Sequence, residues 1–375
     1  MANIARRPDG RWRARYRDPT GTEHSRHFDR KVDAQRWLDE MTTAMTSGTY
    51  VDPRRSKISV HDWADRWLAT KVDLKATTRV RYEGLLRVNI LPRWGSVPLS
   101  DVTHEGVASW VADLSASGLS AATVRQAHRV LSLVLDLAVR DSRLVRNPAN
   151  RVPLPCAAKG EKVFLTHDQV ETLAAAAGDS STTVLFLAYT GLRWGELAAL
   201  RVRRLDLLRR RAEIVESVAE VRGALVFSTP KTHQSRSVPV PRFLVDQLAG
   251  LVAGKGPDEF VFTAPQGGIL RLQNFRHTVW TRAVRDAGLD GLTPHSLRHT
   301  AASLAIASGA DVKVVQQMLG HASATMTLDL YGHLYGDRLD EVADRMDAAR
   351  ERSRTQAGSS VAAGQTVTAL RPRSS

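Results

Sequence analysis

The residues of this chain that could do chemistry lie in four short stretches of its C-terminal half. The first stretch is TGLRWGEL, residues 190–197. Gly191 can end the apolar helix before it, so that Arg193 falls in the opening turn of the next helix. A guanidinium beside the free backbone N–H groups of a helix start suits a phosphate oxygen. Taken alone, the stretch favours a plainer interpretation, in which Arg193 pairs with Glu196 on one helix face.

The second stretch is STPKTHQSRSVPV, residues 228–240, which places Lys231 at the tip of a predicted hairpin between two strands. A lysine at such a tip is usually a solvated charge at the edge of a sheet. If the fold delivers it to a scissile phosphate, its ammonium group could instead protonate a leaving alkoxide oxygen. The stretch by itself leaves both interpretations open.

The third stretch is LTPHSLRHT, residues 292–300, and it predicts a helix start. Thr293 is a favourable N-cap and Pro294 is favourable at the first helical position. This start places His295 and Arg298 in the first turn, three residues apart on one face. An imidazole and a guanidinium then share the positive end of a helix, which is a second arrangement suited to phosphate.

A zinc site is the competing interpretation of the third stretch, because His295 and His299 lie four residues apart. The zinc-protease motif HExxH requires a glutamate where Ser296 stands, and the sequence offers no evident third ligand. Cys156 is the only cysteine, which excludes an intramolecular disulfide and a zinc site built from several cysteines. We therefore expect no metal and an intracellular, reducing compartment.

The fourth stretch is LGHASATMTLDLYGH, which begins at Leu319. Gly320 fits the end of a helix and leaves His321 in a turn. Ser323 or the threonine two residues later can cap the next helix, which carries Tyr331. A half-buried aromatic on an amphipathic helix is the commonest environment of a tyrosine, so this residue has a plain structural interpretation as well.

Together the four stretches contain what phosphoryl transfer without a metal requires. Two arginines can neutralise the charge on the non-bridging phosphate oxygens. A histidine and a lysine can move protons, and a tyrosine can supply the nucleophile. The combination of these residues and their order along the chain favour one shared catalytic role over four independent structural roles.

The series TGLRWGEL, TPKTHQSRSVPV, HSLRHTAASL, LGHASATMTL and DLYGHL resembles the catalytic domain of the tyrosine recombinase, or phage integrase, family. The likeness extends over about residues 160–345 and points to integrases of actinobacterial phages and mobile elements. It implies a site-specific DNA recombinase that integrates such DNA into a bacterial chromosome. The helical and N-terminal parts of the chain resemble the core-site-binding and arm-site-binding domains of the same family.

The resemblance implies a role for each candidate residue. Arg193 and Arg298 grip the scissile phosphate, and His321 adds a third hydrogen bond. His295 acts as an acid/base helper near the nucleophile. Lys231 protonates the departing 5′-oxygen.

The same resemblance assigns the nucleophile to Tyr331, which attacks phosphorus and becomes linked to the 3′-phosphate. Of the six tyrosines, only Tyr331 and Tyr335 follow the LGH turn, and the YGH context of the family matches Tyr331. Tyr335 is expected to pack or to face solvent. Because the phosphotyrosine retains the energy of the broken bond, the resemblance implies no cofactor, no ATP and no metal.

These residues must be positioned by a multidomain, mainly α protein with small β-sheets. We expect an arm-type DNA-binding module of sheet plus helix in residues 1–58 and a helical, SAM-like core-binding domain in 59–150. The α+β catalytic domain follows in 151–345, and a disordered tail in 346–375. A helix at about 339–354 is a candidate for exchange between neighbouring protomers.

Hydrophobic periodicity and turn signals predict the elements of each module. The expected strands are 10–16 and 23–28, with 211–218, 224–227 and 237–240 in the catalytic domain. The expected helices of the first two modules are 30–46, 60–70, 77–89, 104–115 and 120–142, with a loop at 92–98.

The formal net charge of +14 favours a polyanionic partner, and double-stranded DNA is the expected one. No apolar run is long enough to span a membrane, and no signal peptide is evident, so we expect the bacterial cytoplasm and its nucleoid. A basic proteome would raise the charge as well. The resemblance further implies a homotetramer on DNA, with a host DNA-bending protein and an excisionase as possible partners.

Two other functions compete with an active recombinase. A DNA-binding relative that has lost catalysis would lack part of the catalytic set, which is intact here. A metal-dependent nuclease or transposase would need clustered carboxylates, and Asp206, Asp258 and Asp329 do not form such a group in the sequence.

Overall fold

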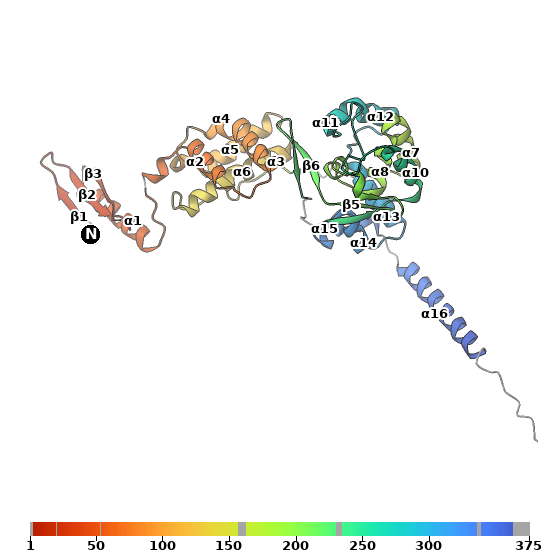
Figure 1. The fold of residues 1–375 in the computed structure, drawn as a ribbon. Helices are drawn as coiled ribbons and strands as arrows, with labels where there is room; N and C mark the ends of the chain where they lie inside the picture. The colour runs from red at the N-terminus through yellow and green to blue at the C-terminus, as the bar shows by residue number, and fades with distance from the viewer. Residues whose placement is uncertain are drawn as a thin grey trace, which may run out of the picture. The chain divides into compact units, whose positions relative to one another are not determined.

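The protein forms two compact units that divide near residue 160. The computed structural model describes residues 3–19, 21–52, 54–156, 163–229, 235–335 and 339–362. Helices dominate, with small sheets in the N-terminal and C-terminal parts (Figure 1). The expected fold class is confirmed.

The N-terminal part is a three-stranded antiparallel sheet covered on one face by helix α1 (Lys31–Thr46) (Figure 1). Ala14 and Tyr16 of the central strand are buried against Ala34 and Leu38 of α1 because alternate strand residues point to one face. The arginines between them therefore lie on the opposite face. The strands are β1 (Asn3–Arg6), β2 (Trp12–Arg17) and β3 (Glu23–Phe28), in that order across the sheet.

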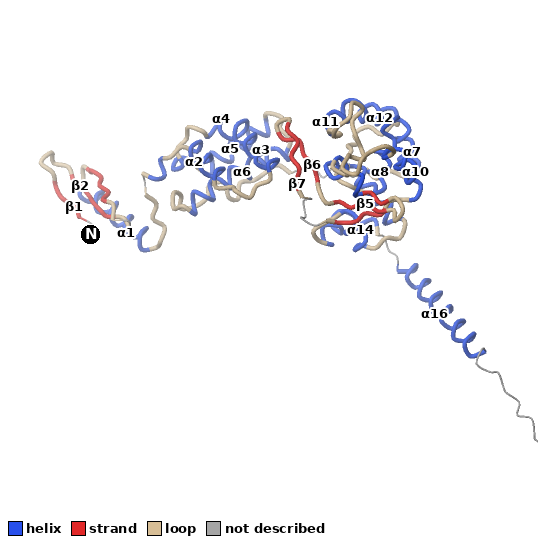
Figure 2. The backbone as a smooth tube through the Cα atoms, viewed as in Figure 1, coloured by secondary structure: helices blue, strands red, loops and turns tan. Residues whose placement is uncertain are grey.

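The next part, about residues 55–156, is helical, and no strand lies among its described residues (Figure 2). Side chains of Ser59, Thr103 and Ser120 cap three of its helices by accepting a backbone N–H of the first turn. The expected loop at 92–98 is wrong at its start, because a π-helical turn at Leu86–Ile90 continues into a helix with Pro92 in its first turn. The helices are α2 (Val60–Ala69), α3 (Ala76–Leu85), α4 (Leu91–Trp94), α5 (His104–Ala116) and α6 (Ala121–Arg140).

The second unit is built around α8 (Ser181–Thr190), which is buried along most of its length and packs against α7 and α13. A helix that is apolar on nearly every side belongs in the centre of a domain. The helices around it are α7 (His167–Ala176), α9 (Trp194–Ala198), α10 (Val245–Val252), α11 (Leu272–Phe275), α12 (Thr281–Asp286), α13 (Ser296–Ala307), α14 (Val312–Leu319) and α15 (Ala324–Tyr331).

The strands of the second unit form two separate antiparallel sheets, so two expectations are corrected. The strand expected at 211–218 is interrupted, and its halves belong to different sheets. The strands that flank Lys231 are also in different sheets and do not pair with each other, while Lys231 itself lies outside the described residues. One sheet contains β4 (Leu205–Asp206), β5 (Arg211–Ile214) and β8 (Arg236–Pro239), and the other contains β6 (Ser217–Val221) and β7 (Ala224–Ser228).

The C-terminal helix α16 runs over Leu339–Ala362. The disordered tail expected from residue 346 is therefore wrong as far as 362, and residues 363–375 lie outside the described part. Ala and Arg, both favourable in helices, are frequent in the segment and favour a helix once α16 has begun. None of the helices in the described ranges is both long and apolar enough to cross a bilayer.

Candidate active site

Arg193 is positioned by the turn between α8 and α9. Gly191 ends α8 with a left-handed φ of 66°, and Arg193 follows as the N-cap of α9. Its Nη1 donates to Glu196 Oε1 at 2.9 Å, and its backbone N–H donates to the other carboxylate oxygen at 3.0 Å. The ion pair expected from the spacing is thus confirmed, and Arg193 Nη2 also reaches the Gly320 carbonyl at 3.4 Å.

Arg298 is the buried centre of the cluster, with 4% of its surface exposed. Its two terminal nitrogens donate to the carbonyls of Gly191 and Leu319, each at 2.6 Å. These carbonyls lie at the ends of α8 and α14, so one guanidinium ties two helix C-termini together. Burial and the nearby charge of Arg193 lower the pKa of Arg298 to about 9, and it stays cationic at neutral pH.

Glu196 holds a second arginine beside the first. Arg236 of β8 donates to its two carboxylate oxygens at 3.1 and 2.5 Å, and its Nε donates to the Met318 carbonyl at 3.2 Å. Burial of Glu196 opposes ionisation, but the hydrogen bonds and charges of Arg236 and Arg193 hold its pKa below the ordinary value. One carboxylate thus faces two arginines beside Arg298, and the excess positive charge favours an anion.

His321 lies in the turn after α14, as expected. Gly320 ends that helix with a φ of 64°, and Ser323 caps α15 by accepting the Met326 N–H. The imidazole is 9% exposed, and its Nδ1 lies 2.9 Å from the Thr327 hydroxyl. Burial and the neighbouring arginines, Arg298 first, lower the pKa of His321 to about 4, so the ring is neutral at physiological pH.

Tyr331 lies at the end of α15 with 1% of its surface exposed. Its hydroxyl is 2.8 Å from Nδ1 of His299, and its ring is parallel to that of His321 at a centroid distance of 6.4 Å. Burial raises the pKa of the phenol, while the charge of Arg298 acts in the opposite direction. The resting phenol is therefore protonated and inaccessible to solvent.

The start of α13 differs from the expected one. The helix begins at Ser296 with His295 as its N-cap, while Thr293 forms the preceding turn by accepting the Ser296 N–H at 2.8 Å. His295 is exposed, and its ring meets that of His299 edge-on at 5.3 Å. His295 is therefore an exposed N-cap before the helix, while Arg298 is a buried residue of its first turn, so the expected placement of both in the first turn is wrong for His295.

The structure thus joins four of the six candidate residues by direct contacts and electrostatic interactions: Arg193, Arg298, His321 and Tyr331. His295 adjoins this group through His299. Lys231 lies outside the described residues, and Tyr335 is half-buried against the core.

Sequence reasoning missed three residues that support this cluster. Arg236 lies in the second stretch but was not singled out, and no local signal links it to Glu196. Thr327 is fully buried, and its hydroxyl forms a hydrogen bond with His321. The sequence pattern of a short helix does not predict such a contact for a threonine. His299 was considered only as a zinc ligand, although its position four residues after His295 places both on one helix face.

A group suited to a metal lies elsewhere in the described residues. Asp18, His24 and Asp52 of the N-terminal part place one potential ligand atom each within 4.8 Å of one another. His24 Nε2 already lies 2.9 Å from Asp18 Oδ2, which gives the two buried groups a partner. This hydrogen bond accounts for the burial of both groups without a metal.

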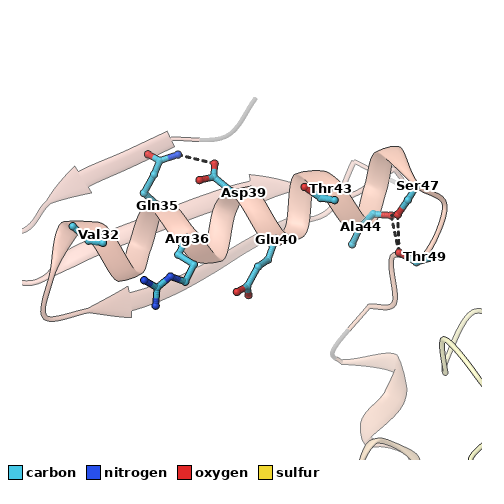
Figure 3. Close-up of a pocket in the computed structure, with 9 residues that line it drawn as sticks. All are labelled: Val32, Gln35, Arg36, Asp39, Glu40, Thr43, Ala44, Ser47 and Thr49. Carbon is cyan, nitrogen blue, oxygen red and sulfur yellow. Dashed lines mark hydrogen bonds between the residues drawn. The ribbon is translucent and has the colours of Figure 1, made fainter.

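A hollow of about 730 Å³ runs along the outer face of α1, far in sequence from the cluster (Figure 3). Most of the residues that line it are polar and exposed, and Gln35 donates a hydrogen bond to Asp39 across one helical turn. Ser47 and Thr49 share a hydroxyl hydrogen bond at its end. Within each of these two pairs the side chains already supply hydrogen-bond partners to each other, so they give no reason to prefer the hollow to the cluster as an active site.

Three family models match the chain, each in a different part. The model described as phage integrase family matches residues 163–338, which contain the whole cluster. The phage integrase N-terminal domain matches residues 2–47, and the phage integrase N-terminal SAM-like domain matches 59–115.

Curated relatives carry matching names. The prophage phiRv2 integrase of Mycobacterium tuberculosis is 27% identical over 348 residues, which cover 89% of this chain and 92% of that protein. The ICEBs1 integrase of Bacillus subtilis is 29% identical over 270 residues, covering 66% and 72%.

Solved structures share the fold. The Tn1549 transposon integrase in complex with a circular intermediate DNA aligns with a TM-score of 0.69 and 23% identity, covering 77% of this chain and 99% of that one. A lambda integrase dimer bound to a COC′ core site aligns with a TM-score of 0.56 and 20% identity, covering 90% and 95%.

Proposed function

Because this chain belongs to the phage integrase family of tyrosine recombinases, we propose that it is an integrase that inserts phage or mobile-element DNA into a bacterial chromosome. It cleaves and rejoins DNA strands through a 3′-phosphotyrosyl intermediate on Tyr331. The observation that carries the proposal is the contact of Tyr331 with a cluster that contains Arg193, Arg298 and His321.

The two arginines bind the scissile phosphate. In the free protein their guanidinium groups donate to Glu196 and to the backbone carbonyls of residues 191, 319 and 320. A guanidinium has five N–H donors, so a phosphate oxygen can be added to these contacts or can replace the longest of them. An anion would also relieve the repulsion that lowers the pKa of Arg298.

His321 adds a hydrogen bond to the same phosphate. Its neutral ring carries one N–H, and a Thr327 hydroxyl that donates to Nδ1 leaves that N–H on Nε2. Nε2 is then a donor for a non-bridging oxygen. Burial and the nearby arginines keep the ring neutral, so His321 serves as a hydrogen-bond donor rather than as a third cation.

The chemical step exchanges one ester for another. Tyr331 Oη forms a bond to phosphorus, and the bond from phosphorus to the 5′-oxygen breaks. Lys231 gives its proton to that oxygen, and His295 assists as an acid/base group near the nucleophile. Rejoining is the reverse step, with the 5′-hydroxyl of the partner strand as nucleophile, so no external energy source, metal or cofactor enters the proposal.

DNA must expose the nucleophile before this step. Tyr331 is 1% exposed in the free protein, so no phosphate reaches it without movement. It sits at the end of α15, eight residues long, between Gly320 and Gly332. A short helix between two glycines is a segment that a bound duplex or a neighbouring protomer can displace.

The other parts of the chain bind the duplex. Arg13, Arg15 and Arg17 of β2 lie on the sheet face opposite α1, and a small sheet fits the major groove of an arm-type site. The helical part binds the core site. Exchange between two duplexes needs four active sites, so the active form is a homotetramer on DNA at the nucleoid. A host DNA-bending protein and an excisionase can bind to this assembly.

Trapping the covalent complex tests the proposal. The probe is a nicked suicide duplex that carries the core site from the junctions of the chain's own element. We expect Tyr331→Phe to bind this duplex but to form no adduct, while the matched variant Tyr335→Phe forms it, with EDTA present in both cases. An adduct on Tyr331→Phe would move the nucleophile to Tyr335. A parent protein that binds without forming any adduct or relaxing a plasmid would be a DNA-binding relative without catalysis.

A further inference from the structure

We propose that His299 is the proton acceptor for the Tyr331 phenol, and thus a catalytic residue in addition to the six named above. The inference rests on the proposed recombinase function. Nδ1 of His299 lies 2.8 Å from Tyr331 Oη, although the two residues are 32 positions apart in the chain. A general base must lie within hydrogen-bond distance of the proton that it removes, and His299 meets this condition.

The other two histidines near the phenol, His321 and His295, make different contacts. The ring of His321 is parallel to that of Tyr331, with 5° between the planes, and its Nδ1 lies beside the Thr327 hydroxyl. His295 is exposed at the start of α13 and meets the edge of the His299 ring. The hydrogen bond to the phenol distinguishes His299 from both.

The surroundings of the phenol make a base useful. Burial raises the pKa of Tyr331, so the hydroxyl keeps its proton until attack. The groups that surround His299 are His295 and Arg298 on its own helix, His321 in the turn after α14 and Tyr331 on α15. The positive charge of Arg298 stabilises a developing phenolate, but it does not remove the proton.

The step balances with His299 as acceptor. The phenol proton moves to Nδ1 as Oη bonds to phosphorus, while the bond to the 5′-oxygen breaks and Lys231 supplies that oxygen with a proton. In rejoining, the incoming 5′-hydroxyl returns its proton to the neutral Lys231 as its oxygen bonds to phosphorus, and Tyr331 Oη leaves and recovers its own proton from His299. The acceptor must therefore begin as the neutral tautomer with its hydrogen on Nε2.

Two substitutions separate proton transfer from positioning. In His299→Asn the side-chain oxygen can accept the same hydrogen bond near the position of Nδ1, but it cannot take the proton. His299→Ala removes both functions. His167→Asn is the matched control, because His167 Nδ1 makes a similar hydrogen bond, 2.7 Å, to the hydroxyl of Tyr189.

The assay is single-turnover cleavage of the nicked core-site duplex by the full chain. We expect both His299 variants to cleave about 100-fold or more slowly than the parent, with duplex affinity and the rate of His167→Asn unchanged within about twofold. The parent rate should fall as the pH is lowered through the imidazole range, and the His299→Asn profile should be shallower there because only the contribution of His295 remains.

A modified substrate identifies the side of the reaction on which His299 acts. A sulfur in place of the bridging 5′-oxygen leaves without needing a proton, so it should restore cleavage by Lys231→Ala. It should not restore cleavage by His299→Asn, because the nucleophile still has to lose its proton.

Three results would overturn the inference. Parent-like cleavage by His299→Asn would reduce the residue to a positioning contact. Faster cleavage by either variant would indicate that the hydrogen bond between His299 and Tyr331 holds the phenol back from attack. Rescue of His299→Asn by the sulfur substrate would show that His299 acts on the leaving group rather than on the nucleophile. Absence of an adduct from the parent protein, by contrast, would refute the recombinase proposal itself.

Discussion

Glu196→Gln should destabilise the second unit strongly at neutral pH. The carboxylate is 1% exposed and accepts from Arg193 at 2.9 Å and from Arg236 at 3.1 and 2.5 Å. Glutamine keeps the size of the side chain but removes the negative charge between the two guanidinium groups. Loss of one partner from a buried ion pair costs about 3–5 kcal/mol, because the remaining charges are left uncompensated.

The corresponding change in melting temperature is large enough to measure. In a unit of this size, 1 kcal/mol corresponds to about 2–4 °C, so the expected decrease is about 6–20 °C. Differential scanning calorimetry of the full chain would follow the transition of the second unit. The matched control is Glu213→Gln, whose carboxylate pairs with Arg204 at 2.8 Å but is 54% exposed, and which should cost at most about 1 kcal/mol.

The pH dependence provides a second measurement. The pKa of Glu196 is lower in the folded than in the unfolded protein, so its charge stabilises the fold above the unfolded pKa. That contribution is lost as the pH falls through the folded pKa, where the carboxyl becomes protonated. The melting temperatures of parent and Glu196→Gln should therefore converge below about pH 4.

Two outcomes would refute this reasoning. If Glu196→Gln melts within error of Glu213→Gln at pH 7, the buried carboxylate does not hold the two arginines. If the difference between parent and Glu196→Gln stays constant into the acid range, the destabilisation comes from packing rather than from the lost charge.

Two further substitutions probe the turns that hold the site. His321 has its pKa lowered to about 4, so the parent should lose unfolding free energy as the pH falls from about 6.5, where unfolded histidine titrates, toward 4. Urea unfolding of His321→Asn across this range should show a shallower pH dependence, and parallel curves would contradict the assignment. Gly191→Ala should cost about 1–3 kcal/mol, since φ is 66° and the new Cβ would lie 2.6 Å from Leu319 Cδ2. Gly178→Ala, with φ of 57° and open space, should lose less in the same calorimetric measurement, and equal losses would exclude the Leu319 contact as a cause.

Local signals in the sequence predicted the features that depend on neighbouring residues. Gly191 and Gly320 were expected to end helices, and both adopt the left-handed conformation there. The spacing of Arg193 and Glu196 predicted their ion pair, which forms. The order of the motifs identified the family before any fold was known. The helix ends and the ion pair depend on residues within about one or two helical turns, where backbone geometry fixes the distances.

Local patterns failed where strand pairing or a helix continuation decided the outcome. The strand expected at 211–218 is divided between two sheets because pairing partners come from distant segments. The turn Leu86–Ile90 continues into α4 through Pro92, although a proline usually suggests a loop. The helix start near Thr293 was two residues off, within the usual uncertainty of helix boundaries.

The sequence by itself determined the inventory of reactive groups and the helix ends beside them, because both are encoded within a few residues. Only the tertiary structure decided how those groups meet: Arg298 bonds to carbonyls 107 and 21 residues away, and Glu196 to an arginine 40 residues away. The burial of Tyr331 and its hydrogen bond with His299 likewise depend on the tertiary structure. Such contacts follow from how α8, α13 and the short helices after it pack into one core, and no local pattern encodes that packing.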